Sequence, residues 1–232
     1  MRYYISDLHF YHSTMIDVDK RGFDMMEQLH AYMIKQWNSR VTDEDEVVVL
    51  GDFSMGNGIQ TWNTLARLRG KIILVEGNHD TNYLDDSEFV DNVLEEITNY
   101  AEYKDGKNLV IASHYPLMFY NKQFDPNTYM LYGHVHNTFD EYLLHQSIKL
   151  SNSQFRKNRK GIVRTTPFQM INTFCLFSDF IPLTLAEWIE IDGYRRQIID
   201  EREKELGHIL TYEEWDDLGN VIKDKINALK GA

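Results

Sequence analysis

The chain has 232 residues, a hydrophobic content of 43% and a formal net charge of −12. Its length is enough to bury a substantial core, and no stretch approaches the roughly 18 apolar residues of a membrane span. The acidic balance argues against broad nucleic-acid binding, which relies on lysine and arginine to neutralise many phosphates. A nuclease is therefore disfavoured from the outset.

Two features predict where the protein works. The single cysteine, Cys175, cannot form an internal disulfide, which fits a reducing compartment. The first predicted strand begins at Arg2, and cleavage of a secretory leader would remove the candidate ligands that follow this strand. We therefore expect a cytoplasmic protein with no membrane partner.

Five short runs rich in β-branched and aromatic residues predict strands, and each is followed by metal-seeking side chains. The runs cover residues 3–6, 47–50, 72–75, 109–112 and 129–132. The side chains that follow them are, in chain order, Asp7, His9, Asp52, Asn78, His114, His134 and His136. Open α/β sheets build their sites at the carboxyl ends of strands, so we expect one shared pocket. Gly51, Gly77 and Gly133 each precede a ligand, where the chain must approach the site closely.

Helical patterns lie between the predicted strands. Asp24 and Glu27 are spaced as in a capping box, and apolar residues then recur on one helical face. A second helix is predicted where Ile59, Trp62 and Leu65 share a face. This alternation of strands and helices indicates a layered α/β domain.

The second half of the chain gives weaker signals. Residues 104–107 predict a hairpin turn, so at least one strand pair is antiparallel and the sheets are mixed. Residues 170–177 predict a late strand, and a helix is expected after Pro182. Because the composition shifts to charged helix formers near Gly193, we expect a catalytic domain at residues 1–192 and a helical extension at 193–232.

The extension carries its own helix signals. Thr211 and Glu214 fit a capping box, and an apolar stripe follows at helical spacing. The stripe consists of Trp215, Leu218, Ile222, Ile226 and Leu229. We expect this face to dock onto the domain, with formation of a homodimer as the alternative.

The candidate ligands offer nitrogen and oxygen donors without a thiolate. This set suits divalent metals, with manganese expected and iron, zinc, nickel, cobalt or magnesium as alternatives. It exceeds the needs of one tetrahedral ion. Two ions about 3.5–4 Å apart, bridged by a carboxylate, would use the whole set and would polarise a phosphoryl group during in-line displacement. The residues thus predict hydrolytic phosphoester chemistry.

The ordered blocks Asp7-x-His9, Gly51-Asp52, Gly77-Asn78-His79-Asp80, His114 and Gly133-His134-x-His136 resemble those of the calcineurin-like metallophosphoesterase superfamily. Together they span residues 7–136. The resemblance implies a four-layer α/β/β/α sandwich with mixed sheets and a dinuclear site. The short interval between the third and fourth blocks leaves no room for a large cap, so we expect the small, capless type.

The resemblance also implies a role for each block residue. The first ion would take Asp7, His9 and His136, the second would take Asn78, His114 and His134, and Asp52 would bridge both. A hydroxide bridging the ions would be the nucleophile. His79 would contact the scissile phosphate or protonate the leaving oxygen, and Asp80 would orient His79. These last two assignments define the expected catalytic residues.

The substrate is expected to be a small phosphorylated molecule. A phosphodiester is slightly favoured, because the blocks contain no arginine pocket for a dianionic terminal phosphate. A phosphomonoesterase or a nucleotide hydrolase of the same fold is the alternative. A non-catalytic protein-binding module ranks low, because every expected ligand is present.

Weaker candidates surround the blocks. His12 could meet the phosphate at the rim or face solvent, and Arg156 and Arg159 lie on a basic loop that could fold over the site or remain solvated. Aromatic residues near the blocks could stack on a nucleobase, although core packing explains most of them equally well. These residues are Phe10, Tyr11, Phe53, Tyr83, Tyr115, Phe119 and Tyr120.

Overall fold

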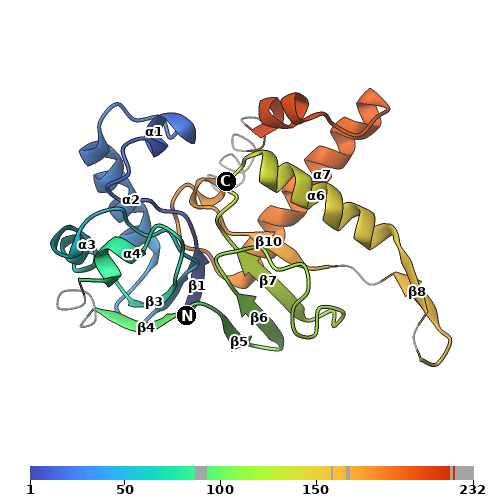
Figure 1. Cartoon of the computed structure of the whole chain (residues 1–232), viewed down its shortest axis with the longest axis horizontal. Helices are drawn as coiled ribbons and strands as arrows, with labels where there is room; N and C mark the ends of the chain where they lie inside the picture. The colour runs from blue at the N-terminus through green and yellow to red at the C-terminus, as the bar shows by residue number, and fades with distance from the viewer. Residues whose placement is uncertain (87–92, 158, 166–167, 220–221, 223–232) are drawn as a thin grey trace.

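Two four-stranded sheets lie side by side in the computed structural model, which describes residues 1–86, 93–157, 159–165, 168–219 and 222 (Figure 1). The first sheet is wholly parallel, in the order β1 (Arg2–Ile5), β2 (Glu46–Val49), β3 (Lys71–Val75) and β4 (Leu94–Thr98). The second has the order β10 (Met170–Asn172), β7 (Thr128–Tyr132), β6 (Asn108–Ala112) and β5 (Ala101–Asp105). Its β5–β6 pair is antiparallel, which confirms the predicted hairpin and a mixed sheet. All five predicted strands are present.

Helices flank both sheets and complete an α/β sandwich (Figure 1). On the side of the first sheet lie α1 (Met15–Val18), α2 (Met26–Arg40), α3 (Gly58–Leu65) and α4 (Thr81–Leu84). On the side of the second sheet lie α6 (Phe139–Ser153) and α7 (Leu185–Leu206). The order of layers is the one that the sequence predicted. Within the part of the chain that the structure describes, no helix has the length and apolarity to cross a membrane.

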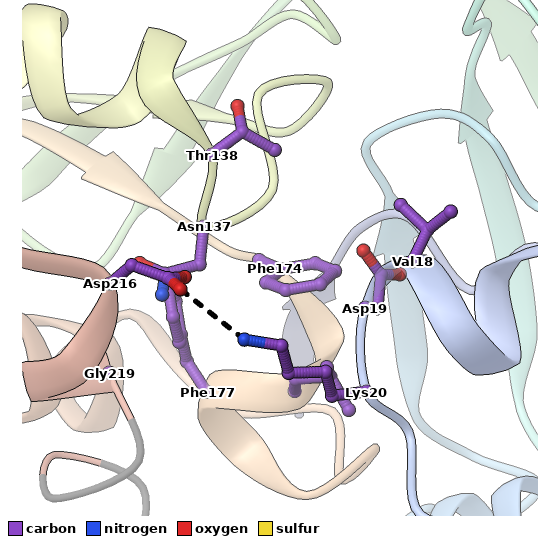
Figure 2. Close-up of a pocket in the computed structure, with 10 residues that line it drawn as sticks. Val18, Asp19, Lys20, Asn137, Thr138, Phe174, Phe177, Asp216 and Gly219 are labelled. Carbon is purple, nitrogen blue, oxygen red and sulfur yellow. Dashed lines mark hydrogen bonds and ion pairs between the residues drawn. The ribbon is translucent and has the colours of Figure 1, made fainter. Parts of the chain in front are cut away.

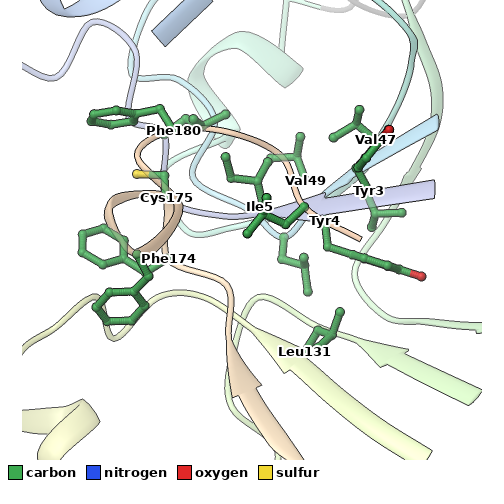
Figure 3. Packing of buried hydrophobic residues seen from close by; sticks show 14 of the residues in the cluster. Tyr3, Tyr4, Ile5, Val47, Val49, Leu131, Phe174, Cys175 and Phe180 are labelled. Carbon is green, nitrogen blue, oxygen red and sulfur yellow. The ribbon is translucent and has the colours of Figure 1, made fainter. Parts of the chain in front are cut away.

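The side chains of the second sheet alternate between two hydrophobic clusters, as the period of a β-strand requires. Val110 and Leu131 belong to the main cluster, which they share with the residues of the first sheet (Figure 3). Ile111 and Met130 point the other way and join a smaller cluster with Ile148 of α6. The main core therefore lies between the two sheets, where it holds their carboxyl ends together.

Two local predictions about helices are wrong. Helix α2 follows Met25, which is extended and offers no side-chain cap, so Asp24 and Glu27 do not form a capping box. In α3, Ile59 and Trp62 are exposed and Thr61 is buried instead. Thr61 is buried because its hydroxyl makes a polar contact: Oγ1 of Thr61 lies 2.8 Å from Oγ of Ser54, within the buried loop after β2.

The C-terminal region packs on the domain. Residues 212–219 are helical, and the predicted capping box is confirmed, since the Thr211 amide donates to Oε2 of Glu214 at 2.8 Å and the Glu214 amide donates to Oγ1 of Thr211 at 3.3 Å. Trp215, Leu218 and Ile222 belong to the main hydrophobic cluster, as expected for a docked helix. The remaining stripe residues, Ile226 and Leu229, lie outside the described residues.

Two further boundaries differ from the expected ones. Helix α7 begins after a capping box of Thr184 and Glu187 and runs through residues 192 and 193, so the compositional boundary falls within a helix. The late strand, β10, ends at Asn172, and a 3-10 helix occupies Cys175–Ser178. Part of the basic loop is itself structured, as the two-stranded pair β8 (Phe155–Lys157) and β9 (Val163–Thr165).

Candidate metal centre

Side chains from both sheets gather into two groups just beyond the carboxyl ends of the strands. The first group consists of Asp7, His9 and His136, and the second consists of Asp52, His114 and His134. In each group, one potential ligand atom per residue lies within 4.8 Å of the others. Asn78 joins the second group, because its Oδ1 lies 3.1 Å from Nε2 of His114. The structure thus brings together all seven predicted ligands.

In the second group, acceptor atoms point at one another. Nδ1 of His114 lies 2.9 Å from the carbonyl oxygen of Leu50, which can only accept, so Nδ1 carries the proton and Nε2 offers a lone pair. This lone pair faces Oδ1 of Asn78 at 3.1 Å and Oδ2 of Asp52 at 3.5 Å. Converging acceptors are stable around a cation, so this group fits a metal ion.

The first group follows the same logic. Nδ1 of His136 lies 2.8 Å from Oδ1 of Asp19, so in neutral His136 the proton is on Nδ1, and Nε2, which lies 3.0 Å from Nε2 of His9, is free to bind a metal ion. Oδ1 of Asp7 lies 3.7 Å from the same Nε2. Burial, together with the nearby His136, holds the pKa of His9 well below its ordinary value. His9 is therefore neutral, the form in which imidazole binds metals.

Asp52 faces both groups with a single oxygen. Its Oδ2 lies 3.5 Å from Nε2 of His9 and 3.5 Å from Nε2 of His114. Its Oδ1 accepts the backbone N–H of His79 at 2.9 Å, which fixes the orientation of the carboxylate. Burial raises the pKa of Asp52, and a neighbouring cation would reverse this effect by favouring the charged form. Of the predicted ligands, Asp52 is thus the one placed to be shared.

The backbone bends sharply at the ligands. Positive φ angles occur at Asp7 (58°), His9 (51°), Asp52 (53°), His134 (70°) and His136 (45°). Asp and His tolerate this left-handed region better than most residues. Such conformations still cost on the order of 1–3 kcal/mol each, and they concentrate at functional sites. The strained backbone at these residues therefore reduces the stability of the fold and directs the ligand side chains into the site.

Glycines allow the ligand loops to approach one another. Gly51 has a φ of +82°, and a Cβ there would collide with the His114 ring. A Cβ on Gly77 would collide with the Asp52 carboxylate, and one on Gly133 would contact the Asp7 carboxylate. The predicted close approach of the chain at these three glycines is confirmed.

A comparison with known families identifies the site. The model of the calcineurin-like phosphoesterase superfamily domain matches residues 3–152, a range that contains every residue of the two groups. The chain belongs to this superfamily. It is accordingly a hydrolase that acts on ester bonds, and the family implies divalent metal ions, which the two groups are suited to hold.

Individual relatives extend the comparison. The phosphoesterase is 34% identical over 143 residues to the uncharacterized protein MJ1445 of Methanocaldococcus jannaschii, a match that covers 60% of this chain and 72% of that protein. Among solved structures, it is similar to AQ665 from Aquifex aeolicus, a protein of unknown function. That pair has a TM-score of 0.56 at 23% identity, and the match covers 82% of this chain and 98% of the other. The second likeness supports the fold.

Further imidazoles of the phosphoesterase border the two groups. The ring centroid of His79 lies 5.3 Å from that of His9 and 5.4 Å from that of His12. Nδ1 of His12 lies 3.1 Å from Nδ1 of His9. Beside the second group, the Tyr115 ring lies 4.7 Å from the His134 ring and is 46% exposed. The structure thus brings His79 and His12 to the site, together with one exposed phenol ring.

Most of the aromatic residues near the ligand blocks serve the core. Phe10, Phe53, Tyr83 and Tyr120 are buried, as core packing predicts, whereas Phe119 is 81% exposed. Tyr11 is partly buried, and its hydroxyl lies 3.1 Å from Oγ1 of Thr64. A stacking surface that combines all of these rings is therefore excluded, and Tyr115 is the member of the set that lies against a predicted ligand and is also exposed.

Asp80 has a different role from the predicted one. Its carboxylate accepts hydrogen bonds from the backbone N–H groups of Gly77, Asp52 and Phe53, each at 2.8 Å, and from the Tyr83 hydroxyl at 2.7 Å. None of the hydrogen bonds that the structure gives this carboxylate comes from the His79 ring. Burial raises its pKa to about 6. Asp80 joins the loops after β2 and β3, because their buried N–H groups need an acceptor.

Asp19 and Arg21 also belong to the site, although the sequence does not predict them. Asp19 contacts the ligand His136, and its Oδ2 accepts from Nη2 and Nε of Arg21 at 2.8 and 3.0 Å. Arg21 also donates to the carbonyl oxygens of Leu8 at 2.6 Å and Asp7 at 3.0 Å. An Asp-x-Arg triplet is too common in sequences to have marked these residues.

The basic candidates do not join the two groups. Arg156 lies on β8, where its guanidinium packs 3.9 Å from the centroid of the Phe124 ring. Arg159 is exposed in the turn after β8. In Figure 1 this hairpin extends away from the sheets beyond the end of α6. The expected contact of these arginines with substrate has no support from the structure, because α6 carries the loop away from the ligand blocks.

Proposed function

We propose that the chain hydrolyses phosphodiesters with two divalent ions, manganese being the expected metal. Asp7, His9 and His136 would hold one ion, and Asn78, His114 and His134 the other. Asp52 would be shared by both. When bound, such ions polarise the phosphoryl oxygens and lower the pKa of water toward neutrality. The single oxygen of Asp52 that faces both groups supports this assignment.

The preference for a diester rests on Arg21. A phosphomonoester dianion is typically held by a guanidinium that forms two parallel hydrogen bonds. Arg21 is the arginine joined to the ligand loops, but its side chain is 0% exposed and is bonded to Asp19 and to two backbone carbonyls. The rim instead offers imidazoles, which suit the single negative charge of a diester. A monoesterase or nucleotide hydrolase of the same fold is the alternative.

Two imidazoles, those of His79 and His12, would act on the substrate directly. His79 would donate a proton to the leaving oxygen, a role for which imidazole is suited near neutral pH. His12, whose ring borders both His9 and His79, would contact a phosphoryl oxygen. No protein nucleophile is needed in this scheme. The scheme assigns the binding of the ions and the transfer of the proton to different side chains.

Tyr115 favours a substrate that carries a ring. Its exposed phenol lies at the second group, against His134 and at 5.0 Å from the His114 ring. Aromatic rings stack on nucleobases with little dependence on base identity. We therefore infer that one substituent of the diester is a nucleoside or a similar aromatic group.

A comparison of two simple substrates tests the proposal. The manganese-loaded chain is expected to hydrolyse bis(p-nitrophenyl) phosphate with a kcat/KM at least about tenfold above that for p-nitrophenyl phosphate, since one poorly paired charge costs about 1.4 kcal/mol. His79→Ala should slow both reactions while the manganese content stays at that of the unsubstituted chain. His208→Ala, at an exposed histidine far along the chain, is the matched control.

Three results would overturn parts of this proposal. Faster hydrolysis of the monoester would establish the alternative monoesterase. A protein that binds manganese but hydrolyses neither ester would indicate a binding module. Equal turnover by the unsubstituted chain and His79→Ala would remove His79 from the mechanism.

A further inference from the structure

A small cavity of about 100 Å³ is lined by residues that contact His136 of the first group, and Figure 2 shows its lining residues. It is bounded by the segment after α1, by the residues after β7 and by the C-terminal helix, and Asp19, Lys20, Phe174 and Asp216 are among its lining residues. Asp19 and Phe174 also contact the ligand His136. Two residues of the cavity lining thus support this ligand.

His136 is held on three sides. Nδ1 lies 2.8 Å from Oδ1 of Asp19, and the ring stacks on Phe174 with a centroid distance of 4.7 Å and an interplanar angle of 26°. Its carbonyl oxygen accepts from Nδ2 of Asn172 at 2.8 Å. Phe174 and Asn172 limit the position of the ring and backbone, and Asp19 alone among the three engages a ring nitrogen. Asp19 therefore determines which nitrogen carries the proton.

Asp19 is itself fixed by a buried cation. Its side chain is 4% exposed, and Arg21 binds one of its oxygens through two nitrogens while the other oxygen meets His136. Arg21 also bonds the carbonyl oxygens of Leu8 and Asp7, on the loop that carries the first two ligands. One network thus links His136 to the loop of Asp7 and His9, although 117 residues separate Asp19 from His136.

The intervening residue, Lys20, has a different environment. Its φ is 52°, and its amine pairs with Asp216 of the C-terminal helix at 3.3 Å (Figure 2). The two side chains are 67% and 46% exposed, and an exposed pair of this kind contributes little. Lys20 thus lines the same cavity as Asp19 but pairs with Asp216 and not with His136, so a substitution of Lys20 is a suitable control.

We propose that Asp19 is a positioning residue for the first metal ion. It holds the proton of His136 on Nδ1 and turns Nε2 toward His9 and Asp7, so it sets the affinity of the first group while leaving the second group unchanged. The proposal rests on the metal-dependent function proposed above. It adds a residue outside all the ligand blocks to the machinery of the site.

Manganese binding to the full chain tests the proposal. Two binding events are expected by titration calorimetry, the tighter one at the first group, whose three side chains are all buried. Asp19→Ala should weaken this event by about 10–100-fold, the usual cost of removing an outer carboxylate partner. The weaker event should change by less than about threefold. Asp19→Asn retains an oxygen acceptor and should give an intermediate loss. A merely structural role would not produce this graded effect on one event.

Two variants serve as controls, and electron paramagnetic resonance adds a spectroscopic readout. Asp17→Ala alters an exposed acid two residues earlier, and Lys20→Gln alters the same cavity wall without touching His136. Both should retain the two affinities. At two manganese ions per chain, the Asp19 variants should show a weaker signal from spin-coupled manganese pairs, and more free or singly bound manganese, than either control.

The outcomes separate this proposal from the proposed function. Unchanged affinities in both Asp19 variants, or equal weakening of both events, would overturn the positioning role even if the chain hydrolyses diesters. Selective weakening in a chain that hydrolyses no ester would leave the positioning role and remove the function. If Asp19→Ala does not fold, the Asn variant decides. A chain that binds no manganese would overturn both.

Discussion

The two ligand groups contain similar donors but differ in access to solvent. Asp7, His9 and His136 are all buried, whereas His134 and Asn78 of the second group are exposed. The first group is also supported by outer partners on two of its imidazoles. One ion would therefore be enclosed by protein while the other would face the substrate.

Asp52→Asn is expected to have the largest effect, because this residue belongs to both groups. The loss of a shared negative charge should lower kcat for bis(p-nitrophenyl) phosphate by about 10³-fold or more, since charge stabilisation at such sites is worth several kcal/mol. Asp43→Asn, at an exposed acid, is the matched control. A fall of less than about tenfold would show that the groups work independently of this carboxylate.

Asp80→Asn tests the support of the second group, because Asp80 joins the loops that carry Asp52 and Asn78. The amide would turn an NH₂ toward buried N–H donors, so the free energy of unfolding should fall by about 3 kcal/mol. Urea unfolding of the metal-free protein measures this loss. Asp85→Asn, at an exposed acid nearby, should change it by less than about 0.5 kcal/mol. An Asp80→Asn protein with an unchanged free energy of unfolding would contradict the role assigned to Asp80.

Partial removal of metal tests the difference in exposure. A limited dose of chelator should release one ion per chain at least about tenfold faster than the other, because exposed ligands lacking outer partners hold metal less firmly. His134→Ala should abolish the weaker binding event and retain the tighter one. Stopped-flow measurement with a metal indicator resolves the two phases. Equal release rates would contradict the asymmetry.

A histidine outside both groups separates the pH dependence of the scaffold from that of the site. Burial, with the cations Arg196, Arg195 and Lys149 nearby, lowers the pKa of His145 to about 3. The folded state therefore favours neutral His145, while the unfolded chain takes up a proton below its ordinary pKa of about 6.5. The contribution of neutral His145 to the free energy of unfolding is therefore fully present above that pH. It is lost as the pH falls below it, by at most roughly 1.4 kcal/mol per pH unit.

His145→Gln provides the comparison for this pH effect. Urea unfolding of both proteins at pH 7.5 and 5.0 should show a smaller loss of stability in the variant, because glutamine does not titrate. His208→Gln, at an exposed histidine, should behave as the unsubstituted chain does. Identical pH dependence in all three proteins would contradict the role of His145.

The ligands could be predicted because each one follows its strand directly. A run such as 47–50 predicts β2 from local composition, and parallel strands then bring their carboxyl ends together, so Asp52 meets His9 without further information. The same local logic predicted the hairpin between β5 and β6 and the capping box at Thr211. These features depend on contacts that are close in sequence or on the regular geometry of a sheet.

The parts that could not be predicted depend on long-range packing. The bond between Asp19 and His136 joins residues 117 positions apart, and no sequence pattern marks Asp19 as the partner of His136. The buried face of α3 follows a polar contact of Thr61, which a search for apolar periodicity misses. Adjacency in sequence predicts that Asp80 pairs with His79, but its oxygens instead accept from buried N–H groups of another loop.

Anomalous diffraction from manganese-soaked crystals would locate the two ions. We expect two peaks per chain, about 3.5–4 Å apart, with Oδ2 of Asp52 between them, Nε2 of His136 beside one and Nε2 of His114 beside the other. A single peak, or two peaks that share no carboxylate, would contradict this expectation.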